Sequence, residues 1–249
     1  MAHAEELGVA YADAASPIRF HLVTRALLDH LPRRARRVAD IGGGYGRQAI
    51  LLARSGRSVA VLDPDKHMLE LVRASLETED LAVRGRVALV EGYGENASRL
   101  LKGRFDLVCC HSVVMYVEKI RPLLLSLSNI TSPKGLISIL TINPASVAMR
   151  EGLQGRWKEA ATLIRNPAYT ASRYIPNRKH RIHSIREAMR KLSFELVAWY
   201  GVGVFTDHLS TFDRSELEEI CELEWLAGLS DPYRSVARMA HLVFKRRPA

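Results

Sequence analysis

Cysteine is scarce in this chain of 249 residues, which contains only Cys109, Cys110 and Cys221. Two of the three are adjacent in a predicted strand, where successive side chains point to opposite faces, so a disulfide framework is not expected. No cysteine and histidine have the spacing of a zinc site either. We therefore expect a reduced protein that binds no metal.

Long hydrophobic runs are also missing, and no stretch approaches the roughly 20 apolar residues that cross a bilayer. The N-terminal residues lack the basic and apolar regions of a signal peptide. Hydrophobic residues make up 47% and charged residues 25%, which is ordinary for a globular protein. We expect a single cytoplasmic domain over residues 1–249 that makes no membrane contact.

Acidic residues are few in one window, residues 150–191. The window holds eleven Lys and Arg against three Glu, a net charge of +8 out of +9 for the whole chain. Such a stretch suggests an anionic partner, such as a nucleic acid or an acidic substrate. A solvated, arginine-rich surface is an equally consistent interpretation.

Apolar runs alternate with amphipathic stretches, a pattern that predicts an α/β fold with a parallel, doubly wound sheet. The expected strands are 37–41, 58–62, 86–90, 105–110, 135–141, 194–200, 202–205 and 240–245. The expected helices are 18–31, one after residue 46, 65–76, 120–130, 184–192 and 215–229. Residues 132–135 have the composition of a turn, and a capping box is expected to start the helix at Ser184.

The strongest motif is a glycine-rich loop that follows the first predicted strand. It consists of Asp40, Ile41, Gly42, Gly43, Gly44, Tyr45 and Gly46. Glycines after a strand let the chain turn tightly and let a nucleotide approach the backbone. Asp63 ends the next strand, 17 residues beyond Gly46, where its carboxylate can accept hydrogen bonds from both hydroxyls of a ribose.

Two features favour S-adenosylmethionine (SAM) over NAD as the ligand of this loop. The spacing of Gly42, Gly44 and Gly46 differs from the G-x-G-x-x-G spacing of dinucleotide-binding loops. Asp40 also precedes the glycines at a position that is usually apolar in NAD loops. A carboxylate suits the positive sulfonium and the amino group of SAM, which has no pyrophosphate. A glycine-rich turn without a ligand is the alternative.

These residues resemble the motifs of the class I SAM-dependent methyltransferases over about residues 19–141. Residues 40–46 match the first motif of that family, and Asp63 matches its ribose-binding acid. Gly94 and Glu95 match the position that contacts the adenine. The resemblance implies an enzyme that uses SAM as its cofactor. It also implies an α/β, Rossmann-like fold with a mostly parallel, seven-stranded sheet.

A narrower resemblance extends over nearly the whole chain, to the bacterial tRNA uridine 5-carboxymethoxy carboxyl methyltransferases and their relatives. The matching stretches are residues 111–117, 201–209, 231–233 and 238–241. By this resemblance, Arg19 would bind the methionine carboxylate of SAM and His111 would lie beside the cofactor. The chain departs from the group at Gly203, where arginine is typical, and at residues 177–181, which lack a run of lysines.

Three residues are candidates for catalysis. His111 follows the fourth strand and could act as a base, or it could only pack on the cofactor or hydrogen-bond it. Tyr11 and Tyr116 could line the acceptor pocket or serve only in packing. Asp207 and His208 could reach the acceptor or form a turn.

Residues 143–183 interrupt the alternation of strands and helices. We interpret them as an insertion after the fifth strand that folds over the site as a lid. The SAM-binding core would then span about residues 19–142, and residues 184–249 would form the C-terminal part of the core.

Three functions are consistent with this sequence. The insertion and Gly203 favour methyl transfer to an oxygen or nitrogen of a small-molecule acceptor, in specialised metabolism. The full-length resemblance and the window 150–191 favour a tRNA methyltransferase that esterifies the carboxylate of a wobble 5-carboxymethoxyuridine. The complete motif set argues against a SAM-binding module without catalysis. The chain could also form a homo-oligomer.

Overall fold

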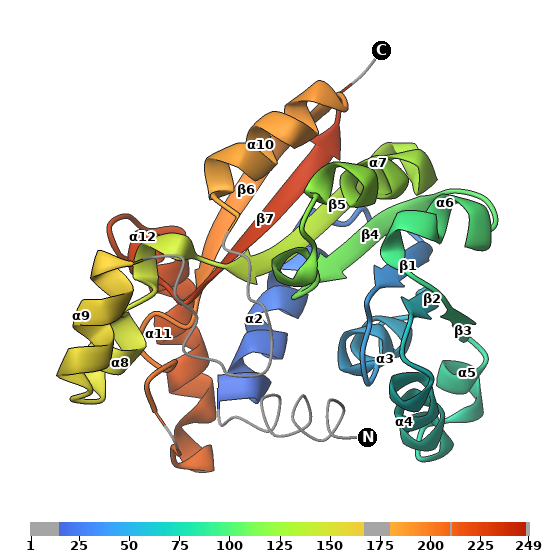
Figure 1. The fold of residues 1–249 in the computed structure, drawn as a ribbon. Helices are drawn as coiled ribbons and strands as arrows, with labels where there is room; N and C mark the ends of the chain where they lie inside the picture. The colour runs from blue at the N-terminus through green and yellow to red at the C-terminus, as the bar shows by residue number, and fades with distance from the viewer. Residues whose placement is uncertain (1–14, 167–179, 210, 248–249) are drawn as a thin grey trace.

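One seven-stranded sheet organises the protein, with helices on both of its faces (Figure 1). The computed structural model describes residues 15–166, 180–209 and 211–247. The strand order is β3-β2-β1-β4-β5-β7-β6. The strands are β1 (Arg37–Ile41), β2 (Ser58–Asp63), β3 (Val87–Glu91), β4 (Phe105–His111), β5 (Thr131–Ile142), β6 (Phe194–Val202) and β7 (Met239–Arg246). The first five are parallel, whereas β7 is antiparallel to β5 and β6. The expected Rossmann-like, mostly parallel architecture is confirmed.

The helices cover the two faces of this sheet, because each has an apolar side that must be buried. The longer helices are α2 (Ala15–His30), α3 (Arg47–Arg54), α4 (Lys66–Glu77), α7 (Ile120–Ile130), α9 (Trp157–Arg165), α10 (Ile182–Lys191) and α11 (Leu217–Leu229). Shorter ones are α5 (Leu81–Arg84), α6 (Ala97–Leu100), α8 (Met149–Leu153) and α12 (Tyr233–Val236), with 3₁₀ turns η1 (Gly94–Asn96), η2 (Val114–Tyr116), η3 (Pro144–Ser146) and η4 (Arg214–Glu216). One core cluster joins α2, α3 and α11 to the sheet, and another joins α6, α7 and α10 to the opposite face. The central strands are buried on both sides, which is why they read as nearly continuous apolar runs.

Two predicted local motifs, a capping box and a turn, are not found in the structure. The capping box at Ser184 does not form: α10 begins at Ile182, and its N-cap residue, Arg181, makes no side-chain cap. Residues 132–135 are not a separate turn, because β5 already begins at Thr131. The register between β4 and β5 shifts over this stretch, and that irregularity explains its turn-like composition.

The two predicted strands at 194–200 and 202–205 are instead one strand, β6, followed by a fixed loop. Glu224 on α11 has no exposed surface. Its carboxylate accepts hydrogen bonds from the backbone N–H groups of Val204, Phe205 and Thr206 at 2.8–2.9 Å, and from the Thr206 hydroxyl at 2.7 Å. These backbone groups therefore bind a carboxylate rather than a neighbouring strand.

The insertion after β5 is helical where it is described. The helices α8 and α9 lie beside α11 and α12, at one end of the molecule (Figure 1). Residues 167–179 of the insertion, like Tyr11, lie outside the described residues. At the end of the insertion, His180 Nε2 lies 2.8 Å from the carbonyl oxygen of Val117.

The three cysteine thiols are buried and free. Within residues 15–166, 180–209 and 211–247, no helix is both long and apolar enough to span a membrane. The same residues contain no group of three or more His, Cys, Asp and Glu side chains arranged to hold a metal ion.

Candidate cofactor and active site

A cavity of about 630 Å³ lies at the carboxyl ends of β1, β2 and β4, with α2 on one side. The order of the sheet reverses between β1 and β4, and ligands of open α/β sheets bind at such a reversal. The predicted site residues that line this cavity are Arg19, Asp40, Gly42, Gly43, Gly44, Asp63, Gly94, Glu95, His111 and Tyr116. The fold thus brings residues from five separate stretches of the chain to one place.

Gly46 differs from its neighbours in the glycine-rich loop, because it is not among the lining residues. It is the N-cap of α3 with φ of 78°, and a Cβ there would lie 2.6 Å from Val72. Its role in the structure is close packing of α3 against α4. Gly44 is the opposite case: its φ is 54° and a Cβ would meet nothing within 4 Å, so its backbone borders open space in the cavity.

Asp63 is held in place by the loop that it faces. Its Oδ2 accepts a hydrogen bond from the N–H of Gly44 at 2.8 Å, and its Oδ1 accepts one from the N–H of Asp65 at 2.9 Å. Burial raises the pKa of Asp63, while these two backbone donors oppose the rise. Each carboxylate oxygen has a second lone pair, so the side chain can still accept hydrogen bonds from a ligand.

Asp40 is a buried carboxylate with an unsatisfied oxygen at the cavity wall. Only 2% of the residue is exposed, and Oδ2 has no hydrogen-bond partner among the described residues. Burial, followed by the negative charge of Asp63, raises the pKa of Asp40 to about 7. Such an oxygen needs a donor or a cation. The ammonium group of SAM has that chemistry, so the residues present fit the cofactor.

Arg19 and His111 face the cavity from α2 and β4. Burial lowers the pKa of His111 to about 3, and the positive charge of Arg19 contributes to that decrease. His111 is therefore neutral over the physiological range. Its Nε2 lies 2.7 Å from the hydroxyl oxygen of Ser138.

Several lining residues were not among the predicted site residues: Phe20, Tyr45, Met68, Tyr93, Ser112 and Val113. Tyr45 lies inside the glycine-rich loop and contacts the ring of Phe20 edge to face, at 6.3 Å between centroids. Ser112 has a φ of 59°, an uncommon value for a residue with a side chain. Its N–H donates to the carbonyl of Leu140 at 2.8 Å, which fixes the turn out of β4. The only sequence signal that could have identified Ser112 as a site residue is its position directly after a buried strand.

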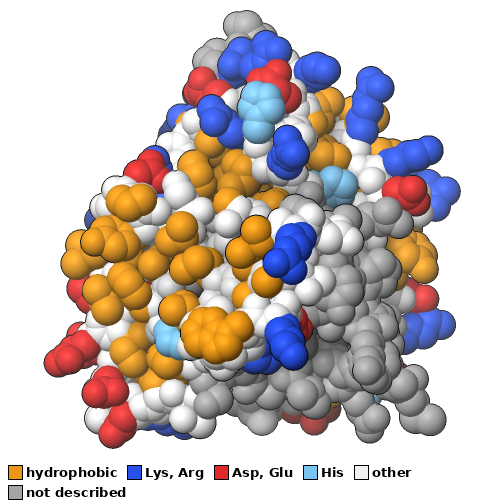
Figure 2. Space-filling model, turned by 60° about the vertical axis from the view of Figure 1, so that its left-hand side comes forward, with side chains coloured by type: hydrophobic (Ala, Val, Ile, Leu, Met, Phe, Trp, Pro, Cys, Tyr) orange, Lys and Arg blue, Asp and Glu red, His pale blue; other side chains and the backbone are white. Residues whose placement is uncertain are grey.

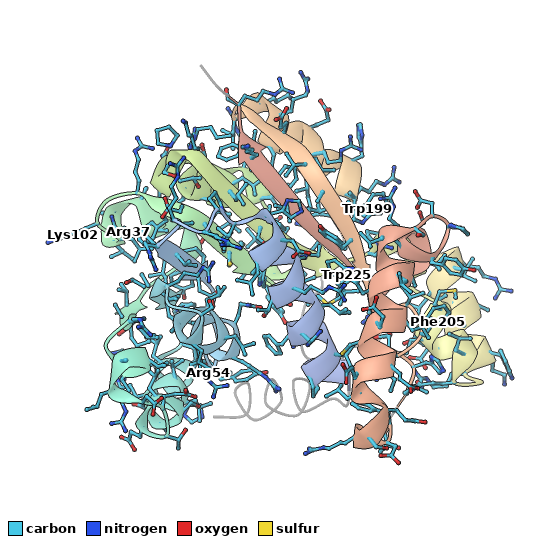
Figure 3. All side chains as sticks on the ribbon, turned by 180° about the vertical axis from the view of Figure 1, so that it is seen from behind. Arg37, Arg54, Lys102, Trp199, Phe205 and Trp225 are labelled. Atoms are coloured by element: carbon cyan, nitrogen blue, oxygen red, sulfur yellow. The ribbon has the colours of Figure 1, made fainter. Side chains whose placement is uncertain are left out.

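Asp207 and His208 lie away from this cavity. They line a separate small hollow, in which Asp207 faces Arg150 at 3.9 Å and Arg238 at 3.6 Å. Phe205, in the same loop, lies on the far side of α11 from α2 (Figure 3). Asp207 therefore balances positive charge at the base of the insertion.

Comparisons with known proteins agree with this geometry. Residues 39–139 match a family model described as a methyltransferase domain. A tRNA 5-carboxymethoxyuridine methyltransferase of Escherichia coli (strain K12) is 25% identical, over 89% of this chain and 84% of that protein. A mitochondrial ubiquinone biosynthesis O-methyltransferase of Schizosaccharomyces pombe is 32% identical, over 45% of this chain and 40% of that protein.

Two solved structures show the same fold. The structure of a SAM-dependent methyltransferase of Thermotoga maritima, described as a possible histamine N-methyltransferase, superposes with a TM-score of 0.62 at 16% identity, covering 98% of this chain and 95% of that one. Magnesium protoporphyrin IX methyltransferase of Synechocystis, with bound S-adenosylhomocysteine (SAH), gives a TM-score of 0.59 at 15% identity, covering 94% of this chain and 83% of that one.

The matched domain, the fold and the cavity indicate a SAM-dependent methyltransferase with SAM as its cofactor, and the chain resembles the class I family of these enzymes. Within this class, the protein resembles the tRNA 5-carboxymethoxyuridine methyltransferases over most of its length.

Proposed function

We propose that this methyltransferase transfers the methyl group of SAM to an oxygen or nitrogen of a small-molecule acceptor. The observation that carries this choice is the distribution of positive charge in the window 150–191. Its described cations are divided between two groups, one on and beside α8 and α9 and the other on and beside α10, and Figure 1 shows these helices well apart. Three of them are engaged locally: Arg150 with Asp207, Arg156 with Glu151 and Glu159, and Arg190 with Glu187. This arrangement does not form one basic stripe of the kind that follows a phosphate backbone.

The surface around α9 is also apolar rather than basic. Figure 2 shows hydrophobic side chains gathered on the face that carries α8, α9, α11 and α12. The exposed members from these elements are Met149, Leu153, Trp157, Ile164, Leu223, Leu226, Leu229, Tyr233 and Val236. A nucleic-acid surface is instead rich in Lys and Arg.

The lid interpretation belongs to this proposal. The hydrogen bond between His180 and the carbonyl of Val117 ties the end of the insertion to a residue that lines the cavity. This contact supports the proposal that the insertion covers the acceptor and excludes water from the transfer.

For the cofactor, we propose a role for each group around the cavity. Asp63 accepts from the ribose hydroxyls, Gly94 and Glu95 border the adenine, and the backbone of Gly42–Gly44 borders the amino-acid end. Asp40 receives the ammonium group, and Arg19 pairs with the methionine carboxylate through its planar fork. SAM supplies an activated methyl group, so the protein contributes mainly position and exclusion of water. Tyr116 borders the space left for the acceptor.

A tRNA acceptor is the second candidate, because the similarity to the Escherichia coli tRNA enzyme covers 89% of this chain. The two candidates are separated by supplying labelled SAM to purified protein with either bulk tRNA or a small-molecule extract. Label in the low-molecular-weight fraction, unaffected by ribonuclease, is the expected result. Label in tRNA would overturn the proposal.

A salt titration gives an independent test. If tRNA follows α9, its affinity falls steeply with salt, and replacing Lys158 and Arg165 with Ala flattens the log–log slope by about two. The same double replacement of Arg186 and Lys191 on α10 is the matched control. We expect only weak tRNA binding and little difference between the two variants.

A further inference from the structure

Two histidines meet at one serine hydroxyl beside the cavity. Ser138 Oγ lies 2.7 Å from Nε2 of His111 and 2.7 Å from Nε2 of His241. The sheet register explains the meeting: Leu140 of β5 pairs with His111 of β4 on one side and with His241 of β7 on the other. Ser138 lies two residues before Leu140, and its side chain is therefore on the same face of the sheet as those of Leu140, His111 and His241.

The positions of the protons in this cluster follow from counting donors and acceptors. A hydroxyl has one hydrogen, so Ser138 can donate to one ring and accept from the other. Ser138 and His241 have no exposed surface, and Nδ1 of His241 has no hydrogen-bond partner among the described residues. If that nitrogen carried a hydrogen, a buried donor would be left unsatisfied, which is rarer than an unsatisfied acceptor. If instead both rings donated to Ser138, the serine hydrogen would be the unsatisfied donor.

One arrangement leaves neither the His241 ring nor the Ser138 hydroxyl with an unsatisfied hydrogen. His241 carries its hydrogen on Nε2 and donates to Ser138, and Ser138 donates to Nε2 of His111. The hydrogen of the neutral His111 ring must then lie on Nδ1. Because Nε2 is engaged with Ser138, the edge with Nδ1 is the one left for the cavity that His111 lines.

We propose that Ser138 and His241 are positioning residues that hold His111 in its Nδ1–H tautomer, so that His111 donates a hydrogen bond to the cofactor carboxylate bound by Arg19. In this role His111 is a donor and not a general base. The lowered pKa values of His111 and His241, both caused mainly by burial, agree with two neutral rings. The groups that act on the pair are Arg19 and His30 on α2.

The tautomer part of the proposal is tested on the ligand-free protein. Nitrogen-15 NMR of histidine-labelled protein near neutral pH distinguishes a ring nitrogen that carries hydrogen from one that does not, and His111→Gln and His241→Gln variants assign the signals. We expect hydrogen on Nδ1 of His111 and on Nε2 of His241. The opposite pair of tautomers, or a charged ring, would overturn the proposal.

The ligand part rests on the proposed cofactor contacts and uses two probes, SAH and methylthioadenosine, which lacks the amino-acid end. Calorimetry should show that Ser138→Ala weakens SAH roughly threefold to tenfold and leaves methylthioadenosine unchanged, as expected for one misoriented hydrogen bond. Ser138→Thr, which keeps a hydroxyl, should restore much of the SAH affinity.

The control is Thr131→Val, which removes another buried hydroxyl from β5. That hydroxyl donates to the carbonyl of Leu127, at the other end of the strand. An equal loss in the control and in Ser138→Ala, or equal losses for both probes, would show that Ser138 has only a structural role. If the wild type bound neither probe, the proposed cofactor contacts would be wrong. The tautomer measurement would still show whether the histidine relay, the hydrogen-bonded chain of His241, Ser138 and His111, holds its hydrogens as proposed.

Discussion

Replacing Asp40 with Asn is expected to stabilise the ligand-free protein while weakening its affinity for the cofactor. The pKa of Asp40 is raised from 3.8 to about 7, mainly by burial. Between these values the folded chain keeps a proton that the unfolded chain has lost, so the Asp40 contribution to stability falls as pH rises. At about 1.4 kcal/mol for each pKa unit, the ionised carboxylate costs the ligand-free fold up to about 4 kcal/mol above pH 7.

The same carboxylate should contribute to binding. An ammonium group beside Oδ2 makes a charge-assisted contact with a carboxylate that is almost fully buried, and its loss costs about 2 kcal/mol. SAH affinity of the wild type should therefore weaken as pH falls below about 7, where Asp40 takes up its proton. Asp40→Asn should bind SAH more weakly and lack this dependence on pH.

The assay is urea unfolding of both chains at several pH values between about 5 and 8, with calorimetry of SAH at the same values. Histidines titrate in this range too, but they contribute alike to both chains, so the difference in unfolding free energy isolates Asp40. Asp106→Asn is the control: this carboxylate on β4 is partly exposed and accepts from the N–H groups of Arg36 and Arg37. A difference that does not grow with pH would refute the argument from burial, and unchanged SAH affinity would refute the assignment of the ammonium group.

Other substitutions test the remaining contacts. Asp63→Ala should lose about 2 kcal/mol of SAH affinity, because the bidentate contact to the ribose disappears; unchanged calorimetric affinity would contradict the role. Arg19→Ala should weaken SAH more than methylthioadenosine, and equal losses would mean that Arg19 does not bind the carboxylate. Glu224→Ala should lower the unfolding free energy by about 3 kcal/mol in urea, since three backbone N–H groups lose a buried acceptor, and a loss below about 1 kcal/mol would contradict that account. Stability should also fall as pH drops below 6.5, because His111 and His241 have lowered pKa values in the folded chain, and His241→Gln should reduce this slope in the same assay.

The sheet and the glycine-rich loop were predictable from the sequence because their signals are local. The segment β1 matched its predicted bounds, and α7 did so as well. The side chain of Asp65, at the predicted start of α4, caps that helix by accepting from the N–H of His67 at 2.9 Å. In each case the decisive residues lie within one turn or one strand of each other, so their spacing alone carries the information.

One of the predictions that failed depended on a distant partner. Residues 202–205 have the composition of a strand, yet the carboxylate of Glu224, 19 to 20 residues later, takes the backbone donors of Val204 and Phe205. Ser184 has the spacing of a capping box, but the helix already begins at Ile182, and the extended residue before it, Arg181, is the N-cap. Local propensity is overridden where a tertiary contact offers the backbone a better partner.

The histidine relay is the clearest case of a site that sequence spacing cannot show. Ser138 and His241 are 103 residues apart, and they meet only because β7 runs antiparallel beside β5. Since side chains alternate along a strand, a register shift of one residue would turn His241 to the opposite face and leave Ser138 without its donor. The register of the one antiparallel strand beside β5 would then decide which nitrogen of His111 carries its hydrogen. In that way the C-terminal strand, which lies outside the matched methyltransferase domain of residues 39–139, takes part in the cofactor site.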